Sequence, residues 1–159
     1  MRAAFHRQQI DNIRSLPVEP DTAKTTTPSC ICKGDFVGDM MRLGFIGTGA
    51  ITTALVTGLC TTKQVVDTIS VSPRNRVKSE LLQKRFSQVV IGHENQDVVD
   101  NSDVIVLAVL PGDLADIVGP LEIRGDQIIV NLLSGTPNSR VAESVNRQCT
   151  VVRAVPLPC

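Results

Sequence analysis

The chain has 159 residues, of which 42% are hydrophobic, and this is enough apolar material for the core of one ordinary domain. Its 16 Lys and Arg residues balance 16 Asp and Glu residues, and the resulting formal net charge of zero excludes the broad basic face of a nucleic-acid-binding domain. All apolar runs are shorter than the ~20 residues of a membrane span, which argues against a membrane protein.

Residues 1–40 differ from the rest of the chain. They include PVEPDTAKTTTPSCICKGD, which is rich in Pro, Thr and charge and has no hydrophobic period. We expect this segment to be disordered or dispensable. Residues 1–16 are compatible with a mitochondrial presequence, and Met40 and Met41 are equally compatible with a translation start directly before the ordered part.

From Met41 onward the sequence alternates between two patterns. Strands are predicted at 42–47, 68–72, 88–91, 103–109, 127–133 and 150–155, and helices at 50–61, 75–86, 95–101, 111–119 and 137–147. Such alternation is typical of βαβ units. The runs at 103–109 and 127–133 are apolar on consecutive residues, as in strands covered by helices on both faces. The sequence therefore predicts an α/β fold with one doubly wound parallel sheet, in the strand order 3-2-1-4-5-6.

Three glycines lie close together in LGFIGTGAITTAL, residues 43–55, between the first predicted strand and the first predicted helix. Gly47 would form the tight turn, and Gly49 would let a pyrophosphate approach the free N–H groups of the helix, because no Cβ stands in the way. Thr52 takes the third glycine position of the pattern Gly-x-Gly-x-x-Gly. The location of the motif between strand and helix favours a Rossmann-type dinucleotide-binding domain over an ordinary turn.

The end of the second predicted strand indicates which dinucleotide binds. Sites for NAD contain an Asp or Glu there, about 20 residues after the glycines, to bind the ribose 2′-hydroxyl. Residues 70–78, SVSPRNRVK, contain no acid and offer Ser72, Arg74 and Arg76 instead. Hydroxyl and guanidinium groups bind a 2′-phosphate, which a carboxylate would repel, although the same arginines could simply begin an exposed helix. We therefore expect NADP(H) as the cofactor.

The five cysteines indicate free thiols rather than a metal site. Cys30 and Cys32 form a Cys-x-Cys pair in a polar segment, and neither His6 nor His93 completes a set of four ligands at a workable spacing. Free thiols fit a reducing compartment, so we expect a cytoplasmic protein without a bound metal.

The region from residue 43 to the end resembles the N-terminal domain of the pyrroline-5-carboxylate reductases, which catalyse the last step of proline biosynthesis. Five segments in order show the similarity: LGFIGTGAITTALVTGL, ISVSPRN, NSDVIVLAVLPGDL, IIVNLLSGTP and VVRAVPLPC. The resemblance implies that residues 41–159 bind NADP(H) and that hydride passes from NADPH to the C=N bond of a cyclic imine.

The resemblance also implies the positions of the cofactor-binding residues. They are Ile46, Gly47, Thr48, Gly49, Ala50 and Ile51 along the pyrophosphate, Ser72 and Arg74 at the 2′-phosphate, Asn95 at the adenosine half, Ala108, Val109, Leu110 and Pro111 along the cofactor, and Leu132, Leu133 and Ser134 near the nicotinamide. No catalytic residue is identified among residues 1–159, because they contain no recognisable general acid and no cluster clearly placed for a substrate carboxylate.

Two positions depart from the family pattern. Leu110 replaces the Lys of its Ala-Val-Lys-Pro turn, and Leu157 replaces the Asn after the sixth strand. The substrate is therefore open, and a related imine or ketone reductase, or a deazaflavin-dependent oxidoreductase of similar fold, is an alternative. Family members continue into a helical domain that makes the dimer and binds the substrate. We expect the chain alone to bind cofactor with little catalysis, either as a cofactor domain or as a non-catalytic module, and to need that domain or to self-associate.

Overall fold

The computed structural model describes residues 41–62, 66–145 and 149–156. The prediction for residues 1–40 and the substitution at Leu157 lie outside these ranges. Within them, no helix has both the length and the apolar character needed to cross a bilayer.

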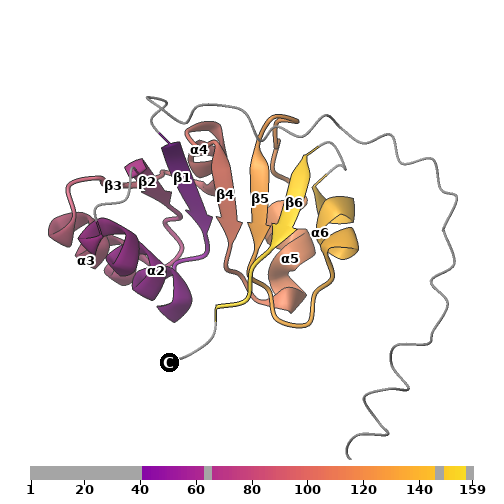
Figure 1. Ribbon diagram of the computed structural model, residues 1–159, viewed down its shortest axis with the longest axis horizontal. Helices are drawn as coiled ribbons and strands as arrows, with labels where there is room; N and C mark the ends of the chain where they lie inside the picture. Colours follow the sequence, from indigo (N-terminus) through magenta and orange to yellow (C-terminus); the bar gives the residue numbers. More distant parts are fainter. Residues whose placement is uncertain (1–40, 63–65, 146–148, 157–159) are drawn as a thin grey trace, which may run out of the picture. The chain divides into compact units, whose positions relative to one another are not determined.

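Strands and helices alternate through the described residues (Figure 1). The strands are β1 (Met41–Ile46), β2 (Val66–Val71), β3 (Val89–Ile91), β4 (Val104–Leu107), β5 (Ile128–Asn131) and β6 (Thr150–Arg153). The helices are α2 (Ala50–Thr61), α3 (Arg76–Arg85), α4 (Asn95–Asp100), α5 (Leu114–Val118) and α6 (Asn138–Ser144), with the 3-10 turn η1 (Pro111–Asp113) before α5. The strands pair in parallel in the order β3-β2-β1-β4-β5-β6, which confirms the predicted doubly wound sheet.

The largest departure from the predicted elements lies between β4 and β5. The single helix predicted at 111–119 is instead η1 followed by the short α5. The turn η1 is tight because the Asp113 N–H donates to the Leu110 carbonyl, a spacing of three residues, at 3.0 Å. The strand predicted at 103–109 also ends earlier, at Leu107. Residues 108–110 therefore leave the sheet and form a loop at its edge.

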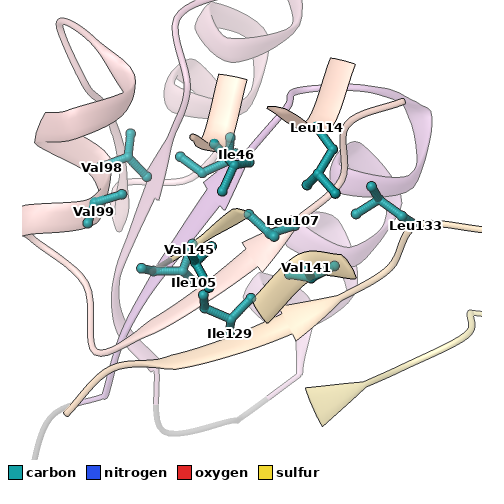
Figure 2. Close-up of a cluster of buried hydrophobic side chains, with 11 residues drawn as sticks. Ile46, Val98, Val99, Ile105, Leu107, Leu114, Ile129, Leu133, Val141 and Val145 are labelled. Atoms are coloured by element: carbon teal, nitrogen blue, oxygen red, sulfur yellow. The ribbon is translucent and has the colours of Figure 1, made fainter. Parts of the chain in front are cut away.

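Helices cover both faces of the sheet. On one face, Val56 of α2 and Leu82 of α3 pack against Phe45, Ile69 and other strand residues in one buried cluster. On the opposite face, side chains of α4, α5 and α6 pack against Ile46, Ile105, Leu107 and Ile129, as Figure 2 shows. Because successive side chains of a strand point to opposite faces, Phe45 and Ile46 belong to different clusters.

The parallel register brings several loops to one edge of the sheet. Phe45 pairs with Val71, Ile46 pairs with Leu107, and Leu107 pairs with Asn131. The segments that follow β1, β2, β4 and β5 therefore leave the sheet side by side at its carboxyl edge. In doubly wound folds, ligands bind in the crevice outside this edge.

Candidate functional site

The turn after β1 requires glycine at position 47. Gly47 has a φ of +98°, a backbone conformation that other residues rarely adopt. A Cβ at this position would lie 2.5 Å from the carbonyl oxygen of Ala108 and 2.9 Å from its carbonyl carbon. The turn therefore needs glycine both for its backbone angle and for its close approach to the loop after β4.

The N-terminus of helix α2 is uncapped and open. Its N-cap residue is Gly49, no side chain accepts a hydrogen bond there, and the first turn contains no acidic residue. A Cβ on Gly49 would have no neighbouring atom within 4 Å, so the space beside it is free. A helix N-terminus has unpaired N–H groups and partial positive charge, and this one can accept an anionic group.

Buried hydroxyl groups fix the turn in place. The Thr48 hydroxyl donates to the Ser72 carbonyl at 2.8 Å, and the Thr52 hydroxyl donates to the Gly47 carbonyl at 2.6 Å. The Ser72 carbonyl also accepts a hydrogen bond from the Ser79 hydroxyl of α3 at 3.0 Å. All four of these hydroxyl-bearing residues are buried, at 4% exposure or less. The turn is therefore tied to the end of β2 and to α3 before any ligand is present.

A cleft of about 530 Å³ lies next to this turn. Three segments form its walls. They are the glycine turn after β1, the segment that connects β2 to α3 together with the first residues of α3, and the loop after β4. The lining residues are Gly47, Thr48, Gly49, Arg74, Asn75, Arg76, Val77, Ala108, Val109, Leu110 and Asp113. We call it the edge cleft, because it lies at the carboxyl edge of the sheet.

Charged side chains meet in the edge cleft. Arg74 Nη1 lies 3.1 Å from Asp113 Oδ2, and the two side chains are 65% and 37% exposed. Arg76, which begins α3, pairs with Glu80 one turn later at 2.8 Å. Asn75 caps α3, since its side-chain oxygen accepts a hydrogen bond from the Lys78 N–H at 3.3 Å. Among the described residues that line the cleft, Asp113 is the one carboxylate, and it comes from η1 and not from the end of β2.

Most of the predicted pyrophosphate and cofactor residues come together here. Gly47, Thr48, Gly49, Arg74, Ala108, Val109 and Leu110 all line the edge cleft. Ala50 and Ile51 form the exposed start of α2, and Pro111 begins η1 directly after Leu110. Ile46, directly before the turn, is fully buried, so its side chain belongs to the core and not to the surface of the cleft.

Ser72, which the resemblance places at the 2′-phosphate, is buried and hydrogen-bonded within the protein. The residue is 1% exposed, and its hydroxyl accepts a hydrogen bond from the Gly47 N–H at 3.0 Å. The same hydroxyl lies 3.2 Å from the Thr48 hydroxyl. Ser72 is therefore placed under the glycine turn, where it holds the turn to β2.

Asn95 and residues 132–134 lie outside the edge cleft. Asn95 begins α4 and lines a separate depression with Asp116 and Glu122. Leu132 lies beside the end of β4, because its N–H donates to the Leu107 carbonyl at 3.1 Å. Leu133 is buried in the core and Ser134 is exposed. Both residues follow β5, at the same edge of the sheet as the edge cleft.

Two polar residues at this edge were not predicted. Asp113 faces Arg74. The sequence could have marked Asp113 as a site residue, because it follows the fourth predicted strand, at the sheet edge where ligands bind. Asn131, at the end of β5, is fully buried. Its side chain accepts a hydrogen bond from the Leu133 N–H at 2.9 Å and donates to the Thr136 carbonyl at 3.1 Å. Asn131 therefore shapes the loop that contains residues 132–134.

Comparison with known proteins decides the family. The sequence model of the family described as NADP oxidoreductase, coenzyme F420-dependent, matches residues 42–135. The chain belongs to this family. The matched range contains β2 to β5, all of β1 except Met41, and every residue that lines the edge cleft.

Pyrroline-5-carboxylate reductases are among the relatives of this chain. Pyrroline-5-carboxylate reductase 1 of Bacillus spizizenii is 27% identical over 122 residues, which cover 74% of this chain and 41% of that protein. The structure of the Coxiella burnetii pyrroline-5-carboxylate reductase matches with a TM-score of 0.68 and 22% identity, over 76% of this chain and 45% of that one. Plasmodium falciparum pyrroline carboxylate reductase with NADP bound matches with a TM-score of 0.62 and 18% identity, over 74% and 44%.

These similarities confirm the predicted resemblance to the N-terminal domain of pyrroline-5-carboxylate reductases and the predicted fold. The chain spans less than half the length of the curated relatives it matches, since it covers 41% of the Bacillus protein and 43% of the Methanosarcina acetivorans one. The similarity therefore concerns the part of those proteins that corresponds to this sheet.

Proposed function

We propose that this chain is the NADP(H)-binding part of an NADPH-dependent reductase of the pyrroline-5-carboxylate reductase type, which acts in proline biosynthesis. One observation is central to the proposal. The open, uncapped N-terminus of α2 at Gly49 faces the same cleft as Arg74 and Arg76, and the end of β2 provides no carboxylate.

The residues of the edge cleft fit such a cofactor. The free N–H groups at the start of α2 would bind the pyrophosphate, and the absence of side-chain atoms at Gly49 leaves room for it. Arg74 would bind the 2′-phosphate through charge-assisted hydrogen bonds. Ser72 would act indirectly, since its hydroxyl holds the turn that the pyrophosphate meets. The NADP bound by the Plasmodium falciparum relative supports the same type of ligand for this fold.

When bound, the cofactor supplies hydride to the carbon of an imine C=N bond. The chain itself would bind and orient the cofactor, and the apolar residues Ala108, Val109 and Leu110 line one side of the cleft. The described residues of the cleft include neither histidine nor cysteine, and Asp113 is engaged with Arg74. Orientation of the imine therefore depends, in this proposal, on a second wall that the described residues do not provide.

Three alternatives rest on specific observations. Leu110 is 70% exposed where the resemblance expects a lysine, which favours a different imine or ketone substrate. The family description names coenzyme F420-dependent oxidoreductases, so a deazaflavin-dependent reaction is a related alternative. The incomplete cleft favours a second function, a dinucleotide-binding module without catalysis of its own.

We also propose how the chain is located and assembled. Cys60 and Cys149 are free thiols in the described residues, which fits a reducing, cytoplasmic location. Ile128 and Val152, on the sheet face that α2 and α3 leave uncovered at β5 and β6, are 40% and 47% exposed. This exposed apolar face supports contact with a helical domain or a second copy of the chain.

Titration of the 159-residue chain with NADPH and NADH tests the proposed function. We expect one saturable site that prefers NADPH, and loss of binding of both cofactors in Gly49→Val. The matched control is Gly112→Val, because Gly112 lies in η1, has no atom near its Cβ position and does not line the cleft. Absence of NADPH binding by the wild-type chain, or unchanged binding by Gly49→Val, would contradict the proposal.

A further inference from the structure

We propose that Asp113 is a specificity-determining residue of the edge cleft, which weakens the preference for NADP(H) over NAD(H) by competing with the 2′-phosphate for Arg74. The inference rests on the proposed function, because it concerns the same cofactor. It assigns a role to a residue that neither the glycine motif nor the resemblance suggested.

The two side chains bridge the cleft from opposite walls. Arg74 belongs to the loop between β2 and α3, whereas Asp113 ends η1 after β4, and the residues are 39 positions apart in the sequence. Arg74 Nη1 nevertheless donates to Asp113 Oδ2 at 3.1 Å, and both residues line the same cavity. The ion pair therefore crosses the space beside the end of β2, where the 2′-position of a bound dinucleotide lies in this fold.

Asp113 is the more firmly held partner. Its N–H donates to the Leu110 carbonyl at 3.0 Å, and η1 begins with the restricted backbone of Pro111. Its side chain is 37% exposed, against 65% for Arg74. An exposed ion pair adds little stability, because both groups are well solvated and the pair is screened by salt. The bridge can therefore open at small cost, mainly by movement of the long Arg74 side chain.

The charge of Asp113 acts differently on the two cofactors. A phosphate has a charge of about −2 at neutral pH, so a 2′-phosphate bound to Arg74 lies close to the carboxylate and is repelled by it. Arg74 must also exchange one anionic partner for another. NAD(H) has a hydroxyl at this position, which can donate a hydrogen bond to a carboxylate. Asp113 thus provides, from η1, the acid that NAD sites usually have at the end of the second strand.

The test compares NADPH and NADH binding by the full chain and by Asp113→Asn, at low and at moderate salt. We expect the dissociation constant for NADPH to fall by about 3–10-fold, the range for loss of an exposed ion pair together with a nearby repulsion. We expect the constant for NADH to change less, and in the opposite direction if it changes. The gain for NADPH should shrink as salt rises, because the groups are solvent-exposed.

Two further variants separate the role of Asp113 from a general effect of charge. Asp116→Asn removes the same charge three residues later from an exposed position of α5 that lies outside the edge cleft, and we expect no change in either constant. In an Arg74→Ala background, Asp113→Asn should give a smaller gain, because the competition for Arg74 is gone. Asp113→Ser removes the carboxylate with a smaller side chain and should give the same gain as Asp113→Asn.

Several outcomes would overturn the inference. Weaker or unchanged NADPH binding in both Asp113 variants, equal shifts for the two cofactors, or an equal gain in Asp116→Asn would each do so. Failure of the proposed function is distinguishable, because it appears in the wild-type chain as no NADPH binding. A wild-type chain that binds NADPH, with Asp113 variants that bind it no better, overturns the role of Asp113 alone.

Discussion

Replacement of Gly47 by alanine should destabilise the domain strongly, because the structure gives this residue two separate constraints. Its φ of +98° is strained for any residue with a side chain, at a cost of about 1–3 kcal/mol. The added Cβ would lie 2.5 Å from the Ala108 oxygen and 2.9 Å from the Ala108 carbon, and these are backbone atoms that cannot rotate away. Forced displacement in a packed region costs about 1–3 kcal/mol more. Gly47→Ala should therefore lower the free energy of unfolding by about 2–6 kcal/mol.

Urea unfolding followed by far-UV circular dichroism measures this loss, and the chain has no Trp or Tyr for intrinsic fluorescence. Gly49→Ala is the matched control, since Gly49 has a φ of −91° and no atom within 4 Å of the point where a Cβ would lie. Its stability should change by less than about 1 kcal/mol, because reduced backbone freedom of the unfolded chain opposes a poorer helix cap. A Gly47→Ala variant as stable as the wild type, or a Gly49→Ala variant equally destabilised, would refute the described turn.

Three other outcomes are expected. Arg74→Ala should weaken NADPH binding by about 1–3 kcal/mol and NADH binding much less, by calorimetric titration, and equal losses would rule out a contact with the 2′-phosphate. The hydrogen bond from Arg42 lowers the pKa of Asp103, so this pair contributes stability above the ordinary pKa of an aspartate and loses it as the pH falls below about 4. Asp103→Asn should therefore lower the urea midpoint slightly at pH 7, with a difference that shrinks below pH 4, and a difference that grows in acid would contradict this sign. The 159-residue chain should bind NADPH but reduce pyrroline-5-carboxylate at far less than about one turnover per second. Faster turnover would show that this chain orients the imine without a second wall from another domain.

The sheet was predictable because its signals are local. Each strand is a short apolar run between helix-like segments, and parallel pairing then follows from the length of the connections. The glycine pattern also predicted the turn before α2, since Gly47 has the positive φ that the motif requires. The strand order and the site edge follow from the same reasoning, without knowledge of any side-chain contact.

The details of the site were less predictable, because they depend on contacts between distant segments. The sequence does not show that the Ser72 hydroxyl turns inward to the Gly47 N–H, 25 positions away. It also does not show that Asp113 meets Arg74 across the cleft, or that Asn95 faces another depression. Such orientations are fixed by where loops leave neighbouring strands, and a pattern of residue types does not contain that information.

The central claim is that the edge cleft binds NADP(H) through the start of α2 and distinguishes the 2′-phosphate through the start of α3. Backbone amide NMR spectra of the 159-residue chain, titrated with NADP⁺ and separately with NAD⁺, test it most directly. The account predicts that both cofactors shift the amides of residues 47–51 and 108–110, and that NADP⁺ alone strongly shifts those of residues 74–77. Shifts centred on other residues, or one pattern for both cofactors, would contradict it.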